Sequence, residues 1–388
     1  MPDWRSYFPI IRDRARAPEF NSLFLFVTSR CNSLCRTCFY FDKLNSRDDL
    51  TREQIERLSA TAGTFRKLWI SGGEPFLRPE LGEILTMFVR DNGVRNINLP
   101  TNGLMAEKIF QTIDYVLRNT SDASIDLNFS LDGLANTHDA IRGVPNNFVR
   151  TLATMRQAER RYQGERRLRR NVLTVITREN YGEVLRLGLQ LLENTESSGH
   201  YFQTVRGGGP DASLQRMTRE QLAELHRRLM PVHRAYARKL FAHLPAGPRH
   251  VAEMYYLGNL RLHFDLHERC FDAPARWPMA CTAGQTSLVV DHNGKFRSCE
   301  MRPVIGDLAE FDYDVRAALG SAQMQREVAA IPQDNCWCTH SCFIEDSSKF
   351  SARVQLFEIP WAWWRQRWDR LQTAPLDEIE KFKSVEMA

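Results

Sequence analysis

The chain has 388 residues and a formal net charge of +5, with 43% hydrophobic and 26% charged residues. This composition is that of an ordinary globular protein, so it excludes a largely disordered chain and a fibrous one. The length allows one large domain or two of moderate size.

The N-terminal stretch, which we assign as an extension over residues 1–21, lacks the features of a secretory signal. No apolar run approaches the length of a membrane span. We therefore expect a cytoplasmic protein. In a reducing compartment, clustered cysteines serve as metal ligands or redox groups in preference to disulfides.

Strands and helices alternate along the chain from residue 22 to residue 206. The apolar run SLFLFVTS at 22–29 predicts a buried strand that ends just before Cys31. Thr51 and Gln54 form a capping box at the start of the next helix. Further strands are expected at 67–71, 96–100, 124–131, 171–177 and 200–205, and further helices at 80–93, 106–117, 147–161 and 181–194.

Six such units predict an α/β fold with a parallel sheet, helices on its outer face and functional groups at the carboxyl ends of the strands. The number of units fits a partial (β/α)6 TIM-like barrel, which we place at residues 22–213. A basic run at 156–171 has no interleaved aromatic pattern. We interpret it as a solvated helix end with the loop into the next strand, and predict no nucleic-acid binding.

The character of the sequence changes after residue 213. Residues 214–265 predict a bridging helical segment that begins with a capping box at Thr218. Residues 266–348 contain six cysteines and little periodicity, which predicts a small region organised by bound metal.

Residues 349–388 predict a C-terminal aromatic helix with Trp361, Trp364, Trp368 and Leu371 on one face. Such a face is typical of an interfacial helix, so contact with a membrane surface is one interpretation. We favour the alternative that the helix docks on the barrel.

Three cysteines lie close together in the segment CNSLCRTC, at positions 31, 35 and 38. A cubane iron-sulfur cluster normally takes four thiolates, one for each iron. Three ligands leave one iron open, and an open coordination position is where a metal centre does chemistry.

The C-x3-C-x2-C spacing on the loop after the first strand resembles that of radical S-adenosylmethionine (radical SAM) enzymes. The segments SGGEP at 71–75, PTNG at 100–103, SLDG at 130–133 and HDAIRG at 138–143 recur in the same order in family members with C-terminal SPASM or twitch extensions. The resemblance implies a [4Fe-4S] cluster held by Cys31, Cys35 and Cys38, with S-adenosylmethionine (SAM) chelated at the open iron.

The same resemblance implies the residues that contact SAM. Gly72 and Gly73 lack side chains, so backbone can approach the methionine moiety, and Glu74 offers acceptors for its ammonium group. Ser130 and Arg142 match positions that contact the ribose and the carboxylate. Asn102 is a further candidate in this pocket, and a structural salt bridge is the alternative role for Arg142.

The later cysteines lie around a predicted hairpin that turns at HNG, residues 292–294, and this segment resembles the start of a SPASM/twitch domain. The resemblance implies one auxiliary [4Fe-4S] cluster held by Cys270, Cys281, Cys299 and Cys342, which leaves Cys336 and Cys338 as surplus. A three-and-three division, or a tail cysteine in place of Cys270, stays open. A four-cysteine zinc site is the alternative, and His340 is expected to be exposed.

The resemblance implies an oxidoreductase that takes a hydrogen atom from its substrate. We expect a small molecule, such as a sugar- or cyclitol-like natural-product intermediate, to be dehydrogenated or epimerised. Modification of a peptide side chain and modification of a lipid-linked substrate are the alternatives. Glu300 and Asp291 are candidate acid/base groups, and a flavodoxin- or ferredoxin-type protein is the expected reductant.

Overall fold

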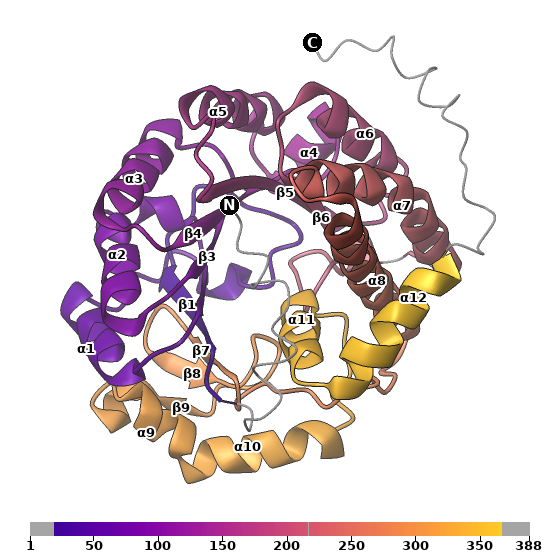
Figure 1. The fold of residues 1–388 in the computed structure, drawn as a ribbon. Helices are drawn as coiled ribbons and strands as arrows, with labels where there is room; N and C mark the ends of the chain where they lie inside the picture. The colour runs from indigo at the N-terminus through magenta and orange to yellow at the C-terminus, as the bar shows by residue number, and fades with distance from the viewer. Residues whose placement is uncertain (1–18, 216, 367–388) are drawn as a thin grey trace.

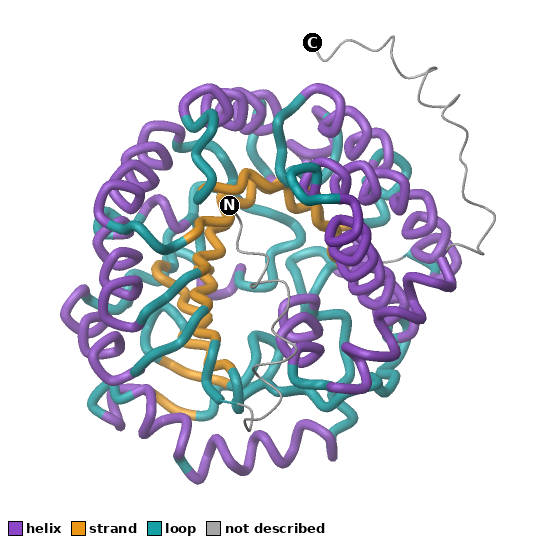
Figure 2. Tube along the Cα trace, viewed as in Figure 1, coloured by secondary structure: helices purple, strands orange, loops and turns teal. Residues whose placement is uncertain are grey.

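The computed structural model describes residues 19–215 and 217–366. Within them, one curved sheet forms an inner arc and most helices stand outside it (Figures 1 and 2). The strands are β1 Ser22–Thr28, β2 Lys67–Gly72, β3 Asn96–Thr101, β4 Ser124–Ser130, β5 Leu168–Ile176, β6 Gly199–Thr204, β7 Ser287–Val290, β8 Lys295–Arg297 and β9 Gly306–Asp307.

Most of the helices follow the strands around the outside of this arc. They are α1 Arg52–Ala62, α2 Leu81–Asn92, α3 Ala106–Asn119, α4 Ala135–Arg142, α5 Asn147–Arg161, α6 Val184–Asn194, α7 Arg219–Phe241, α8 Ala246–Arg269, α9 Val315–Gly320, α10 Ala322–Gln333, α11 Ser341–Lys349 and α12 Ile359–Gln366. The predicted capping boxes at Thr51 and Thr218 begin α1 and α7, as expected.

The strand order in the described part of the sheet is β6-β5-β4-β3-β2-β1-β7-β8-β9. Strands β1 to β6 pair in parallel, which confirms the predicted α/β fold with a partial barrel. The arc does not close on itself through strands, because α8, α11 and α12 stand on the open side (Figure 1).

The C-terminal region continues the sheet of the barrel. Strand β7 pairs in parallel with β1, from Ser287 beside Ser22 to Val290 beside Leu25. Strands β7 and β8 form the expected antiparallel hairpin. The sheet therefore crosses the division that we predicted between the barrel and the cysteine-rich region.

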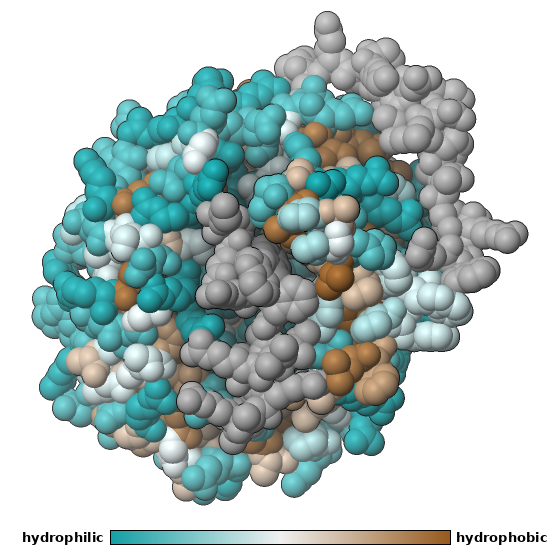
Figure 3. Space-filling view, viewed as in Figure 1, coloured by the Kyte–Doolittle hydropathy of each residue, from teal (hydrophilic) through white to brown (hydrophobic). Residues whose placement is uncertain are grey.

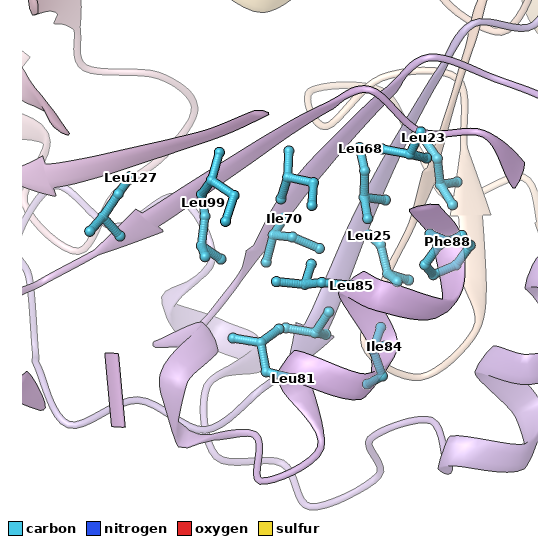
Figure 4. Packing of buried hydrophobic residues seen from close by; sticks show 14 of the residues in the cluster. Leu23, Leu25, Leu68, Ile70, Leu81, Ile84, Leu85, Phe88, Leu99 and Leu127 are labelled. Carbon is cyan, nitrogen blue, oxygen red and sulfur yellow. The ribbon is translucent and has the colours of Figure 1, made fainter. Parts of the chain in front are cut away.

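The main core fills the space between the sheet and its outer helices (Figure 4). Alternate residues of β1 and β2, such as Leu25 and Ile70, point outward to meet one face of α2, where Leu81, Leu85 and Phe88 are all fully buried. The period of two in the strands and of about 3.6 in the helix places these apolar side chains on facing surfaces.

Leu85→Ala is expected to lower the free energy of unfolding by about 2–5 kcal/mol, because it leaves a cavity in this core. Leu85 has no exposed surface. Urea unfolding of the anaerobically reconstituted protein, followed by far-UV circular dichroism, measures the change. Val149→Ala is the matched control, since Val149 on α5 is 55% exposed and its truncation should change stability by no more than about 0.5 kcal/mol. Equal stability of the two variants would contradict this packing.

The described part of the chain contains no helix that is long and apolar enough to cross a membrane. The face seen in Figure 3 is mostly hydrophilic, with an apolar patch over the lower end of α12. On α12, Trp361 is 55% and Trp364 45% exposed, and their ring centroids lie 4.9 Å apart in a stacked arrangement. Leu356 and Phe357, just before α12, are exposed apolar residues as well. Trp368 and Leu371, the other members of the predicted face, lie outside the described residues, as does most of the predicted N-terminal extension.

Candidate functional site

The three-cysteine loop follows β1 at the carboxyl end of the sheet. The backbone N–H of Cys31 donates to Asn45 Oδ1 at 3.1 Å, and the N–H of Arg36 donates to the carbonyl of Ile141 at 2.9 Å. The loop is thus fixed to the end of α4. Cys31, Cys35 and Cys38 all line one cavity of about 630 Å³ inside the partial barrel.

The three thiols suit a shared cationic group. Burial raises the pKa of Cys31 to about 12 and that of Cys38 to about 11, and neighbouring cysteines of the same loop add to both shifts. Metal binding requires thiolates, so a bound positive group is needed to remove these protons. Within residues 19–215 and 217–366 no set of three ligating side chains converges on a single ion. An iron-sulfur cluster does not require three ligands to converge on one ion, because each thiolate binds its own iron.

Two glycines bring the end of β2 against the cysteine loop. A Cβ at Gly72 would lie 2.3 Å from the Thr28 carbonyl oxygen, and a Cβ at Gly73 would lie 2.0 Å from that of Arg30. Only glycine fits at either position. Both residues line the cavity as predicted for SAM contacts, and the structure adds a second reason for their identity, which is the close packing of backbone on backbone.

Glu74 connects this turn to the PTNG segment. Its Oε1 accepts a hydrogen bond from the Thr101 hydroxyl at 3.0 Å, and its Oε2 accepts one from the N–H of Asn102 at 2.7 Å. Burial raises the pKa of Glu74 to about 7, although these two hydrogen bonds lower it in part. Because both oxygens already have donors, the carboxylate holds two loops together, and its predicted contact with the SAM ammonium group stays a prediction.

Asn102 and Arg142 extend the same network to the cysteine loop. The Asn102 side chain donates to Asn32 Oδ1 at 2.7 Å and to Ser33 Oγ at 3.1 Å. Arg142 Nε lies 2.7 Å from the buried Asp132 carboxylate, and its Nη1 lies 3.7 Å from Cys35 Sγ. All six predicted SAM contacts line the cavity together with the three cysteines: Gly72, Gly73, Glu74, Asn102, Ser130 and Arg142.

The two candidate acid/base residues lie in different places. Glu300 lines the cavity and is hydrogen-bonded to His340 Nε2, and Arg206 Nη1 lies 3.2 Å from it. Burial opposes ionisation of Glu300, but Arg206 and His340 hold its pKa below the usual value. Asp291 is not among the lining residues. It is buried in ion pairs with Lys43 and Arg297, so its predicted catalytic role has no support from geometry.

The prediction for His340 was wrong. The residue is 1% exposed, and its ring is held between Glu300 and Arg206. A histidine between two cysteines in CWCTHSC is typical of a loop, but His340 occupies the N-cap position of α11 without a side-chain capping bond. The first turn of that helix is partly buried.

All six later cysteines lie in or pack against one apolar cluster, but their electrostatic neighbours differ. Burial raises the pKa values of Cys281, Cys299 and Cys338, and nearby thiols raise them further. Cys336 raises the pKa of Cys281, and Cys281 raises that of Cys299. Cys281 and Cys336 both raise the pKa of Cys338. Cys270 also acts on Cys338. These five therefore form a group.

Cys342 has a different environment. Burial raises its pKa to about 12, and the neighbouring charges that modify this value belong to Arg206, Glu300, Glu345 and Lys67. Cys342 also lines the cavity, which Cys270, Cys281 and Cys299 do not. Proximity thus groups Cys336 and Cys338 with Cys281 and Cys299, whereas Cys342 faces the cavity.

Residues 25–188 match the Radical SAM superfamily. The chain contains a radical SAM domain. Its curated relatives include a protein of Methanococcus maripaludis strain C7 named "Probable GTP 3′,8-cyclase", 34% identical over 123 residues that make up 30% of this chain and 38% of that protein. A protein of the same name from Methanocaldococcus jannaschii is 32% identical over 112 residues, 28% of this chain and 37% of its own. The chain thus matches less than two fifths of the length of these relatives.

Solved structures with a related fold include Streptococcus suis SuiB, with a TM-score of 0.56 at 14% identity over 90% of this chain and 77% of SuiB. Native anSMEcpe with bound AdoMet has a TM-score of 0.53 at 15% identity, over 94% of this chain and 100% of that chain. Similarity at this low sequence identity shows that the chain shares the fold of these structures over most of its length. It does not assign a substrate.

A radical SAM domain implies a [4Fe-4S] cluster and SAM as cofactors, and the nine cysteines of the chain allow an auxiliary cluster. The residues present fit these groups, since three clustered thiols and a glycine-lined, polar end of one cavity lie together.

Sequence reasoning missed several polar residues on the inward faces of the strands, including Arg169 and Asn171. The alternation of buried and partly exposed side chains along residues 168–176 was the available signal for these inward-facing residues. We overlooked it because the first residues of this strand belong to the basic run.

Proposed function

We propose that this chain is a radical SAM oxidoreductase that removes a hydrogen atom from a small polar molecule, sugar- or cyclitol-like, in a dehydrogenation or epimerisation. One observation carries the proposal: the three cysteines and the predicted SAM contacts share a single cavity with polar side chains from the inner faces of β2 to β6. When bound, the cluster and SAM supply a 5′-deoxyadenosyl radical that takes the hydrogen atom.

The residues of the chain have separate roles in this proposal. Cys31, Cys35 and Cys38 hold the cluster, and Arg142 and Ser130 bind the carboxylate and the ribose of SAM. Arg142 is suited to a carboxylate because a guanidinium donates in a bidentate manner. Glu300 is positioned to accept a proton released by the substrate, because it lines the cavity and is hydrogen-bonded to His340.

The electrostatic neighbours of the later cysteines favour an auxiliary cluster with a revised ligand set. Cys336 contributes to the raised pKa of Cys281, and Cys338 to that of Cys299, whereas Cys342 lies among charged residues of the cavity wall. We therefore favour these four over the set implied by the family resemblance. Such a cluster would accept an electron in a dehydrogenation.

Two other substrate classes remain alternatives. A peptide side chain is one, because radical SAM enzymes act on small molecules or peptides and SuiB has been solved with its precursor peptide SuiA. A lipid-linked substrate is the other, and the stacked, exposed pair Trp361 and Trp364 is the observation that favours it.

The first test is SAM cleavage by the anaerobically reconstituted protein. With dithionite as reductant, we expect 5′-deoxyadenosine and methionine to form in equal amounts, measured by liquid chromatography with mass spectrometry, and neither to form without reductant. A protein that binds SAM but releases no 5′-deoxyadenosine under these conditions would overturn the catalytic proposal.

A further inference from the structure

The inward faces of β2 to β5 carry polar side chains where closed eight-stranded barrels usually carry branched apolar ones. We call this set the polar floor: Trp69, Asn98, Asp126, Asn128, Arg169 and Asn171, all of which line the cavity. The strand register arranges them in two layers. Trp69, Asn98, Asp126 and Arg169 are direct neighbours in one layer, and Asn128, Asn171 and Gly199 are neighbours in the next.

Several floor side chains are fixed by contacts with each other. Asn171 Nδ2 donates to Asn128 Oδ1 at 3.1 Å, and Asn128 Nδ2 donates to the Asp126 carbonyl oxygen at 2.8 Å. The Trp69 ring stacks on Phe24 with 5.3 Å between centroids. These contacts set the directions of the remaining polar atoms, as a binding site requires.

Two of those atoms have no hydrogen-bond partner among the described residues. They are Asn171 Oδ1, an acceptor, and Trp69 Nε1, a donor. Asn171 is 1% and Trp69 8% exposed. A buried polar atom without a partner costs about 1–3 kcal/mol, so native proteins rarely keep one without a use. A ligand that both donates and accepts hydrogen bonds would satisfy both atoms.

Gly199, which pairs with Asn171 on the neighbouring strand, has no side chain beside one of these atoms. A Cβ at this position would lie 3.4 Å from Asn171 Oδ1 and 3.4 Å from the Tyr201 hydroxyl oxygen. Glycine inside a strand often marks a place where a ligand comes close to the backbone. A methyl group at this position would contact Asn171 Oδ1 and the Tyr201 hydroxyl, whereas glycine leaves that side of the acceptor without a side chain.

The charges around the floor are compensated from within the protein. Arg169 Nη2 lies 2.7 Å from Asp126 Oδ2, and the Lys67 and Lys349 ammonium groups lie 2.8 Å and 3.0 Å from Glu345 Oε1. A phosphate or carboxylate ligand is normally held by arginine or lysine groups that point at it. A floor whose cations already have anionic partners instead favours an uncharged ligand.

The floor also lies at a suitable depth below the cofactor end. Asn128 and Asn171 precede Ser130 and Leu173 by two residues on their strands. Two residues of a strand span about 7 Å. A molecule of the size of a six-membered ring, seated on the floor, would therefore have its upper face near the predicted SAM contact Ser130.

We propose that the polar floor binds an uncharged polyhydroxylated ring, with one hydroxyl donating to Asn171 Oδ1 beside Gly199 and another accepting from Trp69 Nε1. This inference rests on the proposed function and assigns its substrate class and specificity residues. It favours this class over a nucleoside triphosphate and over an acidic peptide, whose charges are normally held by cations that point at them.

The test is direct binding to reconstituted protein in the presence of SAM, by saturation-transfer difference NMR. The probes are myo-inositol, D-glucose and methyl α-D-glucopyranoside, with GTP as the charged comparison. We expect at least one uncharged probe to bind the wild type, and Gly199→Ala and Asn171→Leu to weaken that binding by about tenfold or more, the equivalent of one lost hydrogen bond of about 1.4 kcal/mol. GTP should not compete.

The matched control is Gly182→Ala, since a Cβ there meets nothing within 4 Å, and its binding should equal that of the wild type. Gly199→Ala adds only one methyl group at an ordinary contact distance, so it tests access to Asn171 Oδ1 even if Asn171→Leu fails to fold. Absence of binding by all three polyols, equal binding by Gly199→Ala and wild type, or competition by GTP would each overturn the inference.

SAM cleavage without substrate, assayed in the same preparations, separates this inference from the proposed function. If the wild type cleaves SAM and binds no polyol, the substrate class is wrong and the radical SAM chemistry stands. If it binds a polyol and releases no 5′-deoxyadenosine, the catalytic proposal fails while the site stands.

Discussion

Cys35→Ala is expected to reduce the formation of 5′-deoxyadenosine from SAM to the level seen without protein. Cys35 is the middle thiol of the three-cysteine loop, and its Sγ is the one that Arg142 Nη1 contacts at 3.7 Å. Its removal leaves two thiolates where three irons need ligands, and a cubane cluster with an open iron cannot be held by two. Liquid chromatography with mass spectrometry of dithionite-reduced samples measures the product.

Cys342→Ala is the control for this experiment. Cys342 lines the same cavity but is distant in sequence from the three-cysteine loop. The charged residues that modify its pKa are Arg206, Glu300, Glu345 and Lys67, none of which belongs to that loop. The variant should retain substrate-independent SAM cleavage. SAM cleavage by Cys35→Ala at the wild-type rate would refute the assignment of the cluster to this loop.

The second large effect concerns the number of clusters. The triple variant Cys31→Ala/Cys35→Ala/Cys38→Ala should retain about four irons and four sulfides per chain after reconstitution, because one auxiliary cubane remains. The wild type should hold about twice that amount. Colorimetric iron and sulfide assays on anaerobic protein measure both values.

A pair of single variants then tests the revised ligand set. Cys336→Ala should lose the auxiliary iron, since Cys336 neighbours Cys281 and Cys338, whereas Cys342→Ala should keep it. The reverse outcome would restore the set implied by the family resemblance. If the triple variant retains no iron, the later cysteines hold zinc or no metal, and redox-neutral chemistry such as epimerisation becomes the working mechanism.

Local signals in the sequence predicted most of the barrel. The capping boxes at Thr51 and Thr218, and apolar runs such as 22–29, depend on neighbours a few residues away, so their structural meaning can be read along the chain. The three-cysteine loop was placed after β1 for the same reason. Five of the six predicted SAM contacts line the cavity because they lie at or just after strand ends, which meet at one edge of a parallel sheet, whereas Arg142 reaches it from the end of α4.

Other features depend on residues far apart in sequence, and these were missed. Asp126 neutralises Arg169 inside the cavity, so a residue of the basic run that we assigned to solvent lies in the wall. His340 is buried because Glu300 and Arg206 come to it from other segments. The pairing of β7 with β1 joins residues more than 260 positions apart, and no local pattern encodes such a partner.

That pairing makes the barrel dependent on the region that carries the later cysteines. Without β7, one side of β1 would present a row of unpaired N–H and C=O groups directly beneath the three-cysteine loop, and an exposed strand edge of this kind invites association with other chains. The catalytic half therefore cannot be treated as a module to be cut out or exchanged on its own. Exchange of the C-terminal region between related enzymes would have to preserve the edge complementarity of β7 as well as the cluster ligands.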